Sequence, residues 1–270
     1  MEPLPPRAII PSPVEPNVVN ATVARAAVAS IFSRLKASGE DVALLIPDPV
    51  IRVFVQHFDN FPRSAAEAIP MLRWKLKKSV PFDAEETVVS YMRQPAQETG
   101  VDVVTGLARQ RIVREYEALI ESAGMKAGVV LSSSLAAVAL LDDERPTLMA
   151  RLSATTLTTA IVREGILCGY RCTELPSDIE TLSPQLLLEE IYPVVAYYQD
   201  TWHEGIQAVR LAGLGQRLEQ FAAPLQKELQ CSVTSLLQAA EVDGRLRADA
   251  KPLVDRGLDG LLGWMMNRGA

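Results

Sequence analysis

The side chains best suited to chemistry are few and widely spaced. The chain has three cysteines (Cys168, Cys172 and Cys231) and two histidines (His57 and His203). Cys168 and Cys172 are four residues apart in a strand-like stretch, which is not a zinc-ligand spacing. An odd, sparse set of cysteines predicts no disulfide framework and fits a reducing compartment. We therefore predict no metal site.

A serine run is the next candidate for chemistry. Ser132, Ser133 and Ser134 precede a short apolar stretch and are interpreted as a helix cap rather than as a nucleophile. The sequence has no nucleophile-elbow motif, and two histidines offer little choice of general base. Hydrolase chemistry therefore has little support.

A glycine turn follows an apolar strand signal at residues 206–215. Gly213 and Gly215 could let the backbone approach a nucleotide, so both are candidate cofactor-binding residues. Glycine also serves a strand-to-helix turn simply through its permissive backbone angles. Both interpretations remain open.

Residues 147–165, TLMARLSATTLTTAIVREG, predict two strands around a tight turn. Arg151 lies in the first of these strands, and Ser153 follows it directly. Arg151 could form an ion pair or bind an anion, but the simpler interpretation is a solvated arginine at a strand end.

A short basic run, Arg73–Lys78, lies on a predicted helix. A solvated cationic face is the simplest interpretation, and the alternative is a site for an acidic partner or for anionic lipid headgroups. Trp74 within this run is either a core residue or part of a groove.

The composition excludes several classes of protein. The chain has 270 residues and a net charge of −6, which argues against nucleic acid as a partner because phosphate neutralisation needs clustered Lys and Arg. The N-terminus lacks a signal-peptide pattern, and no apolar run reaches about 18 residues. We expect a cytoplasmic protein that reaches the membrane only through a partner.

Strand and helix signals alternate along both halves of the chain, which predicts an α/β or α+β fold. Six prolines in residues 1–19 predict an extended, poorly hydrogen-bonded arm. Helices are predicted from Asn20 to near Gly39 and over 64–79, 110–123, 134–141, 183–201, 216–230 and 253–267. Strands are predicted over 42–46, 51–58, 87–93, 101–109, 127–131, 147–152, 155–163, 166–172, 206–215 and 231–236.

Several blocks, in this order, resemble the PilM family of type IV pilus assembly proteins, which are actin-like. They are VALLIPDPVIRVFVQHF, AIPMLRWKLKKSVPFDAEETVVSYMR, VDVVTGLARQRIVREYEALIESAGMKAGVV, EEIYPVVAYYQDTW and LAGLGQRLEQFAAPLQKELQCSV. The resemblance covers roughly residues 4–268. It implies an actin-like, ribonuclease H-like fold of two lobes. The implied domains are a proline-rich arm (1–18), an inserted small α/β subdomain (19–110), the rest of the first lobe (111–144) and a second lobe (145–270).

The chain departs from this family at three nucleotide elements. The family's first phosphate hairpin has no counterpart after Met1, so the start is either short or has lost that element. The second hairpin normally has Asp-x-Gly, where this chain has Arg151 and Ser153. The family's triple glycine is Gly213-Leu214-Gly215 here. Arginine can contact a phosphate but cannot orient a metal ion as a carboxylate does.

The resemblance implies a scaffold that binds the N-terminal peptide of a PilN-like membrane protein. Trp74 and Phe82 are the candidate residues for that groove. We expect no ATP hydrolysis, with ATP either not bound or bound weakly. A pilus motor ATPase and a second copy of the chain are further partners left open. Two alternatives also stay open: a genuine actin-like ATPase completed by missing N-terminal residues, and a cytoplasmic component of a type II secretion platform.

Overall fold

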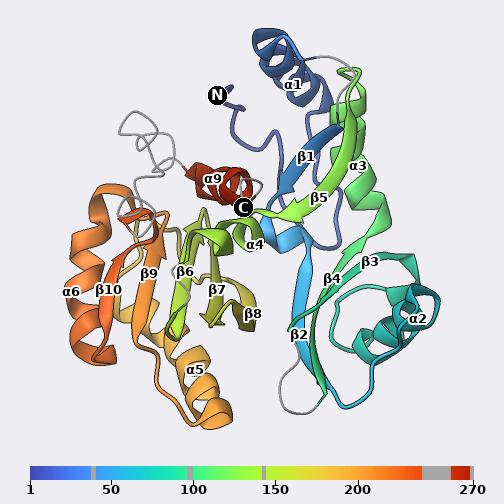
Figure 1. Ribbon diagram of the computed structural model, residues 1–270. Helices are drawn as coiled ribbons and strands as arrows, with labels where there is room; N and C mark the ends of the chain where they lie inside the picture. The colour runs from blue at the N-terminus through green and yellow to red at the C-terminus, as the bar shows by residue number, and fades with distance from the viewer. Residues whose placement is uncertain (38–40, 96–99, 142–143, 239–256, 268–270) are drawn as a thin grey trace. The chain divides into compact units, whose positions relative to one another are not determined.

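The computed structural model describes residues 1–37, 41–95, 100–141, 144–238 and 257–267 (Figure 1). The chain divides into two compact units. The first comprises residues 1–52, 60–92 and 105–132, and the second comprises residues 53–59, 93–104 and 133–270. Each unit is described below by itself.

The first unit contains the N-terminal arm and most of the first half of the chain. Its helices and strands are α1 (Ala21–Leu35), β1 (Asp41–Ile46), η1 (Asp48–Val50), α2 (Ala65–Leu76), η2 (Ala84–Glu86), β3 (Thr87–Arg93), α3 (Gln110–Glu121) and β5 (Lys126–Ser132). Two further strands, β2 (Arg52–Phe58) and β4 (Val101–Arg109), have residues in both units. The strand order β2-β4-β3 makes a three-stranded sheet.

The N-terminal arm has more hydrogen bonds than its prolines suggest. The side-chain oxygen of the fully buried Asn17 accepts hydrogen bonds from the backbone N–H of Ser12 and from the Tyr116 hydroxyl. The Glu115 carboxylate accepts from the backbone N–H groups of Asn17 and Val18, at 2.7 and 3.0 Å. The expectation of a poorly bonded arm was therefore wrong, because one asparagine and α3 supply the partners that the prolines lack.

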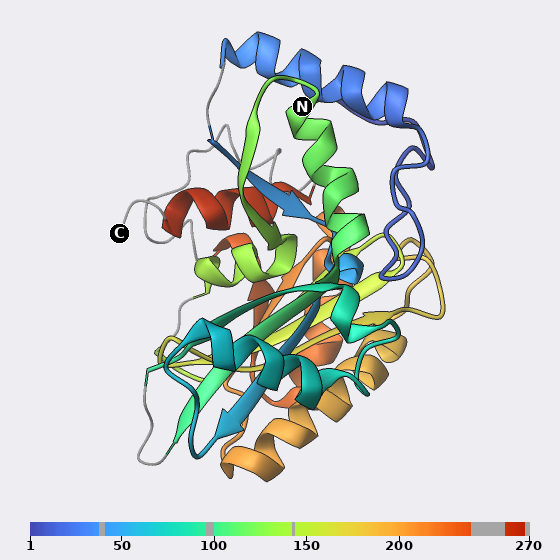
Figure 2. The same ribbon diagram turned by 90° about the vertical axis from the view of Figure 1, so that its right-hand side faces the viewer.

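A parallel pair of strands, β1 and β5, forms the core of the first unit together with α3 (Figure 2). Apolar residues of α3 spaced three and four apart face these strands, and Ile112 and Tyr116 pack with Ile46 and Val50. Asn20 caps α1 by accepting a hydrogen bond from the Val23 N–H.

The second unit is built on a five-stranded sheet of order β10-β9-β6-β7-β8. β6 pairs in parallel with β9 and antiparallel with β7. The elements are α4 (Ser133–Ala137), η3 (Val138–Leu140), β6 (Thr147–Ser153), β7 (Thr156–Arg163), β8 (Ile166–Glu174), α5 (Pro184–Trp202), β9 (Ala208–Ala212), η4 (Gly215–Arg217), α6 (Leu218–Leu229), β10 (Ser232–Ser235) and α9 (Asp259–Asn267).

One face of this sheet packs against α5 and α6. Leu148, Ala150 and Leu152 of β6 share a core cluster with residues of both helices, including Ile191 and Phe221. Successive residues of a strand point to opposite faces, so Met149 and Arg151 point to the other face of the sheet. That second face is where the candidate site lies.

The predicted strands and helices are confirmed, with differences at their ends. The helix predicted over 134–141 is a five-residue α4 followed by a turn of 3-10 helix. The last helix begins at Asp259, while residues 253–256 of the prediction, and Gly39 at the predicted end of the first helix, lie outside the described residues.

Candidate functional site

Gly213 allows its backbone to pack closely against the backbone of Leu152. Its φ is +85°, and a Cβ atom at this position would lie 2.0 Å from the Leu152 carbonyl oxygen. No residue that has a Cβ atom fits there without a shift of the backbone. The interpretation of Gly213 as a structural glycine, which the sequence left open beside nucleotide binding, therefore has a direct steric reason.

Gly215 is different because a Cβ atom there would meet nothing within 4 Å, and only its φ of +51° favours glycine. It begins the short η4 that leads into α6. The two glycines predicted as one cofactor-binding pair therefore have different local constraints.

Arg151 forms a buried ion pair with Asp259, the first residue of α9. The Arg151 Nε donates to Asp259 Oδ2 at 2.5 Å, and Nη2 donates to Oδ1 at 2.9 Å. Both residues are almost fully buried, with 5% of Arg151 and 3% of Asp259 exposed. The simpler sequence interpretation, a solvated arginine at a strand end, is therefore wrong, and the ion-pair alternative is correct.

The ion pair is completed by two weaker neighbours of the guanidinium. Nη1 lies 3.4 Å from the Ser134 hydroxyl oxygen in α4, and Nη2 lies 3.4 Å from the Gly257 carbonyl oxygen. Ser153, the other residue of the altered motif, is exposed at the end of β6, next to a turn in which Ala154 has φ +51°. Arg151 and Ser153 are thus in very different environments although they are two residues apart.

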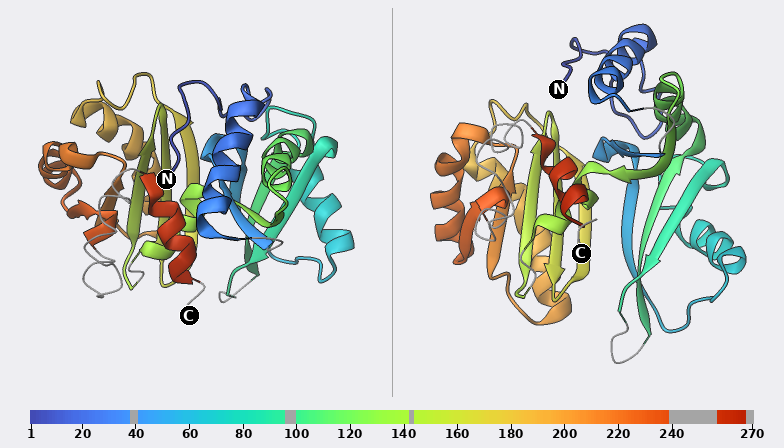
Figure 3. Two further views of the ribbon diagram at one scale, coloured as in Figure 1. Left: turned by 90° about the horizontal axis from the view of Figure 1, so that it is seen from above. Right: turned by 45° about the horizontal axis from the view of Figure 1, so that its top comes forward.

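α9 packs closely on α4 through two glycines (Figure 3). A Cβ atom on Gly260 would lie 2.4 Å from the Ser133 hydroxyl oxygen, and one on Gly263 would lie 2.1 Å from the Ala136 carbonyl oxygen. The glycines are three residues apart and therefore share one face of the helix. This close approach holds the start of α9, and with it Asp259, beside Arg151.

Ser132 is fully buried and is therefore not an exposed nucleophile. Its fully buried hydroxyl donates to the Asp48 carboxylate, which is also buried, where β1 and β5 end. Ser132 directly precedes α4, so the interpretation of the serine run as a helix cap stays a prediction. Ser133 and Ser134 belong to α4 itself.

The two candidate partner-binding residues lie at the C-terminal end of α2 and in the turn after it. Trp74 is 71% exposed, and Phe82 is half-buried. α2 packs inward through Ala68, Leu72 and Leu76. We call the exposed Ala66, Pro70 and Trp74, each four residues from the next, the α2 stripe. An apolar outward face on a surface helix is unusual, because that face is normally polar.

Cations flank the α2 stripe at its C-terminal end. Lys75, Lys77 and Lys78 are exposed, whereas Arg73 is half-buried and donates a hydrogen bond to the Thr87 carbonyl oxygen at 2.8 Å. The basic run therefore divides into one arginine that attaches α2 to β3 and three lysines at the surface.

Cys168 is partly buried, and His57 is paired with a carboxylate. Burial raises the pKa of the Cys168 thiol to about 11, so it is mostly protonated near neutral pH and is a poor nucleophile. His57 Nδ1 lies 2.8 Å from the Asp102 carboxylate, in the segment where Gly100 approaches the same imidazole. Among the described residues, no three His, Cys, Asp or Glu side chains gather as a metal site would need.

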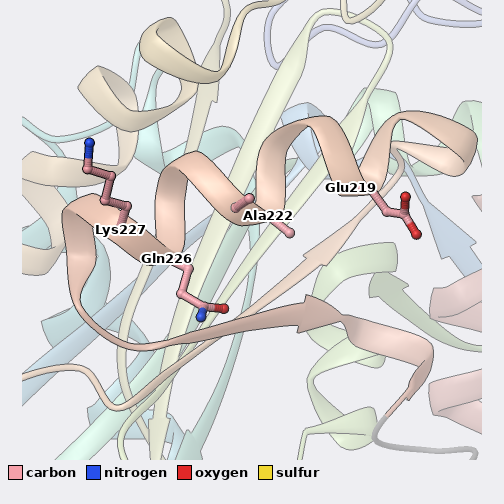
Figure 4. A pocket seen from close by; sticks show the side chains of 5 residues that line it. Glu219, Ala222, Gln226 and Lys227 are labelled. Carbon is pink, nitrogen blue, oxygen red and sulfur yellow. The ribbon is translucent and has the colours of Figure 1, made fainter.

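A shallow depression lies along α6 and is lined by Glu219, Ala222, Ala223, Gln226 and Lys227 (Figure 4). All five residues belong to one helix, and Figure 4 shows Glu219 and Lys227 towards opposite ends of it. None of the candidate site residues named from the sequence lines this depression.

The comparisons with known proteins identify the fold. A chain of the PilM–PilN type IV pilus biogenesis complex superimposes with a TM-score of 0.72 at 17% identity, over 99% of this chain and 89% of that chain. No protein-family model and no curated protein sequence matches. The fold expected from the resemblance, an actin-like α/β fold of the PilM type, is confirmed.

Two further structures match over less of their fold. A Bacteroides thetaiotaomicron protein with an actin-like ATPase fold and unknown function gives a TM-score of 0.48 at 13% identity, over 84% of each chain. The cytoplasmic domain of EpsL, an inner-membrane component of the Vibrio cholerae type II secretion system, gives 0.45 at 14% identity, over 79% of this chain and 83% of that one. No helix in the described part of the chain is long and apolar enough to cross a bilayer.

Sequence reasoning missed Asp259 entirely. The sequence does contain an acidic residue near the start of the final apolar helix, and glycines follow it at positions 260 and 263. Small residues three apart on an apolar helix indicate a face that approaches another backbone closely. Nothing in the sequence, however, assigns that face to Arg151, 108 residues earlier.

Proposed function

We propose that this protein is a cytoplasmic scaffold of a type IV pilus or related secretion assembly platform. The observation that supports the proposal most is the match to a chain of the PilM–PilN complex over 99% of this chain. In this proposal the protein binds the N-terminal peptide of a PilN-like membrane protein. It is thereby attached to the cytoplasmic face of the inner membrane through that partner.

The α2 stripe and the turn that follows it are the proposed partner surface. Trp74 supplies a large exposed apolar area, which is the type of side chain that dominates binding energy at interfaces. Phe82 is the second proposed contact. Three exposed lysines beside Trp74 favour a peptide that has an acidic residue next to an apolar one.

The proposed scaffold works without ATP hydrolysis. The second phosphate hairpin supports this part of the proposal. Arg151 occupies the position where the family has a carboxylate, and Asp259 neutralises its charge. A buried arginine cannot orient a metal ion or water, and here its charge is already paired. We propose that neither Gly213 nor Gly215 binds a nucleotide tightly.

Peptide binding tests the proposal directly. A labelled synthetic peptide with the N-terminal sequence of a PilN-like membrane protein from the same organism is titrated with the full chain, with and without Mg-ATP. We expect saturable binding that Mg-ATP leaves unchanged. Trp74→Ala should weaken the affinity at least about tenfold, equivalent to about 1.4 kcal/mol.

The matched control is Tyr197→Ala, because Tyr197 is an aromatic residue on α5 with 67% of its surface exposed. Tyr197→Ala should bind the peptide as the wild type does. No binding by folded wild-type protein would overturn the scaffold function. Equal affinities of wild type and Trp74→Ala would overturn the α2 stripe as the site, and binding that requires Mg-ATP would favour a genuine ATPase.

A further inference from the structure

We propose that copies of this chain bind one another through two exposed helix faces, the α2 stripe of one copy and a matching stripe on α5 of another. The partner is therefore a second copy of the chain. The inference goes beyond the scaffold function, because it gives α5 a contact that the peptide proposal does not use.

α5 presents an apolar face outwards, as α2 does. Tyr192 and Tyr197 are 62% and 67% exposed, and Pro193 between them is exposed as well. We call these three residues the α5 stripe. The helix packs into the core of the second unit through other residues, namely Leu187, Ile191 and Tyr198. Large apolar side chains grouped on an exposed surface mark a site of interaction.

Acidic residues end the α5 stripe on both sides. Glu189 lies four residues before Pro193 and Asp200 three residues after Tyr197, so both exposed carboxylates share the face of the stripe. Glu189 accepts a hydrogen bond from Gln185 Nε2 at 3.1 Å, and α5 contains no Lys or Arg. The α5 stripe is therefore an apolar surface between two negative charges about 16 Å apart along the helix axis.

The α2 stripe has positive charges at its ends. The exposed Arg63 lies just before α2, and the exposed Lys77 and Lys78 follow its last residue. Glu67 is the acidic residue of α2, and it lies about 100° around the helix from Ala66. Each stripe is thus an apolar surface between like charges, and the charges of the two stripes have opposite signs.

This complementarity favours contact between unlike stripes. Two α5 stripes would bring carboxylates together, and copies that each have a net charge of −6 repel one another overall. The α2 stripe against the α5 stripe instead places Trp74 against the two tyrosines and cations beside carboxylates. An aromatic centre with a charged rim is the usual composition of a protein interface, and the long Lys and Arg side chains can reach over that centre.

Sedimentation velocity of the full chain, without peptide, tests the contact. At about 50 mM salt, the weight-average mass of the wild type should rise with micromolar protein concentration to at least twice that of one copy. Salt at about 0.5 M screens the flanking charges and should weaken the association. Trp74→Glu and Tyr197→Glu should each weaken it at least about tenfold, because each places a charge in the apolar centre of one stripe.

The matched control is Leu35→Glu. Leu35 is an apolar residue at the end of α1, with 69% of its surface exposed, and it belongs to neither stripe. This variant should associate as the wild type does. All three substituted side chains are exposed, so the melting temperatures of the variants should equal that of the wild type.

A mixture of the two stripe variants tests whether α2 meets α5. Trp74→Glu keeps an intact α5 stripe and Tyr197→Glu keeps an intact α2 stripe, so one complete contact can form between a copy of each. Each variant alone should remain a single copy at concentrations where the equimolar mixture forms dimers and nothing larger. Contact between two α2 stripes would leave Tyr197→Glu associated and would overturn the inference.

Three further results would overturn it: a wild type that remains a single copy throughout, association that either variant leaves unchanged, and a mixture that stays unassociated. Trp74 belongs to both proposed surfaces, so the peptide is titrated at protein concentrations below the onset of association. The two proposals fail separately. A wild type that binds the peptide but remains a single copy overturns this inference alone, whereas one that associates without binding the peptide overturns only the scaffold function.

Discussion

The residue at 151 belongs to the internal structure of the second unit, because its guanidinium is buried in an ion pair. The resemblance predicts a carboxylate there, and this chain has an arginine whose charge is balanced by Asp259. An exposed arginine would contribute little to stability. Because both partners are buried, breaking this pair should cost far more than breaking an exposed one.

A double-mutant cycle measures that dependence. Arg151→Met and Asp259→Ala should each lower the free energy of unfolding by about 3–5 kcal/mol, because each leaves a buried charge without its partner. The double variant should lose clearly less than the sum of the two losses. Urea denaturation at 25 °C provides the measurement.

The control for the cycle is the ion pair between Arg114 and Glu117, which lies at the surface of α3. Arg114→Ala should cost no more than about 1 kcal/mol. Additive losses for Arg151 and Asp259 would show that the two side chains do not depend on each other, contrary to the structure.

Two buried acids predict how stability depends on alkaline pH. Burial raises the pKa of the Cys168 thiol from 9.0 to about 11 and the pKa of the Tyr198 hydroxyl from 10.0 to about 12. As pH rises above about 9, the unfolded chain loses these protons first, so the folded state binds more protons. The free energy of unfolding should therefore fall with rising pH, and below about pH 9 these two groups should contribute no slope.

Urea denaturation between pH 8 and 10.5 tests this sign. Cys168→Ala removes one of the two groups and should make the decline shallower. Constant or increasing stability over this range would contradict the assignment of the two buried groups.

At the scale of elements, the attachment of α9 depends on the absence of side chains at two positions. Replacing glycine by alanine inside a helix normally stabilises it by about 1 kcal/mol. Here the added methyl group of Gly263→Ala would meet the Ala136 carbonyl oxygen, because the two backbones approach closely. We predict the opposite sign, a loss of at least about 1 kcal/mol in the free energy of unfolding.

Gly205→Ala is the control, since a Cβ atom at Gly205 would meet nothing within 4 Å and its backbone conformation is ordinary. That variant should be as stable as wild type or slightly more so. Urea denaturation followed by tryptophan fluorescence provides the measurement, and Trp264 of α9 contributes to that signal together with Trp74 and Trp202. A stabilised Gly263→Ala variant would show that α9 does not approach α4 as described.

Elements could be predicted from the sequence where their signals are local. The strand at 147–153 has apolar residues on alternate positions, and α3 has them three and four apart, so both were found close to their observed bounds. The site could not be predicted in the same way. Asp259 contacts Arg151 because α9 packs on α4. A local sequence pattern does not indicate which helix will pack beside which strand.

The glycine pair illustrates the same limit within one turn. Gly213 and Gly215 look alike in the sequence, and only the structure shows that one lies against the Leu152 carbonyl while the other is open. Similarly, the six prolines of the arm predicted few hydrogen bonds, whereas Asn17 and Glu115 provide them. Contacts between residues distant in sequence account for each of these differences.

For the whole molecule, 17% identity accompanies a TM-score of 0.72 with a chain of the PilM–PilN complex. A fold can be retained at this identity when the hydrophobic pattern and the order of elements are kept. The proposed scaffold therefore keeps the architecture of an actin-like protein and uses it for partner binding.

The ion pair also has a consequence for the synthesis of the protein. Arg151 is added to the growing chain 108 residues before Asp259. Throughout that interval the strands of the sheet can form, but the ion pair that buries the guanidinium cannot. Because the ion pair can form only after residue 259 has been added, a ribosome-bound chain halted before that residue should remain accessible to proteases on this face of the sheet.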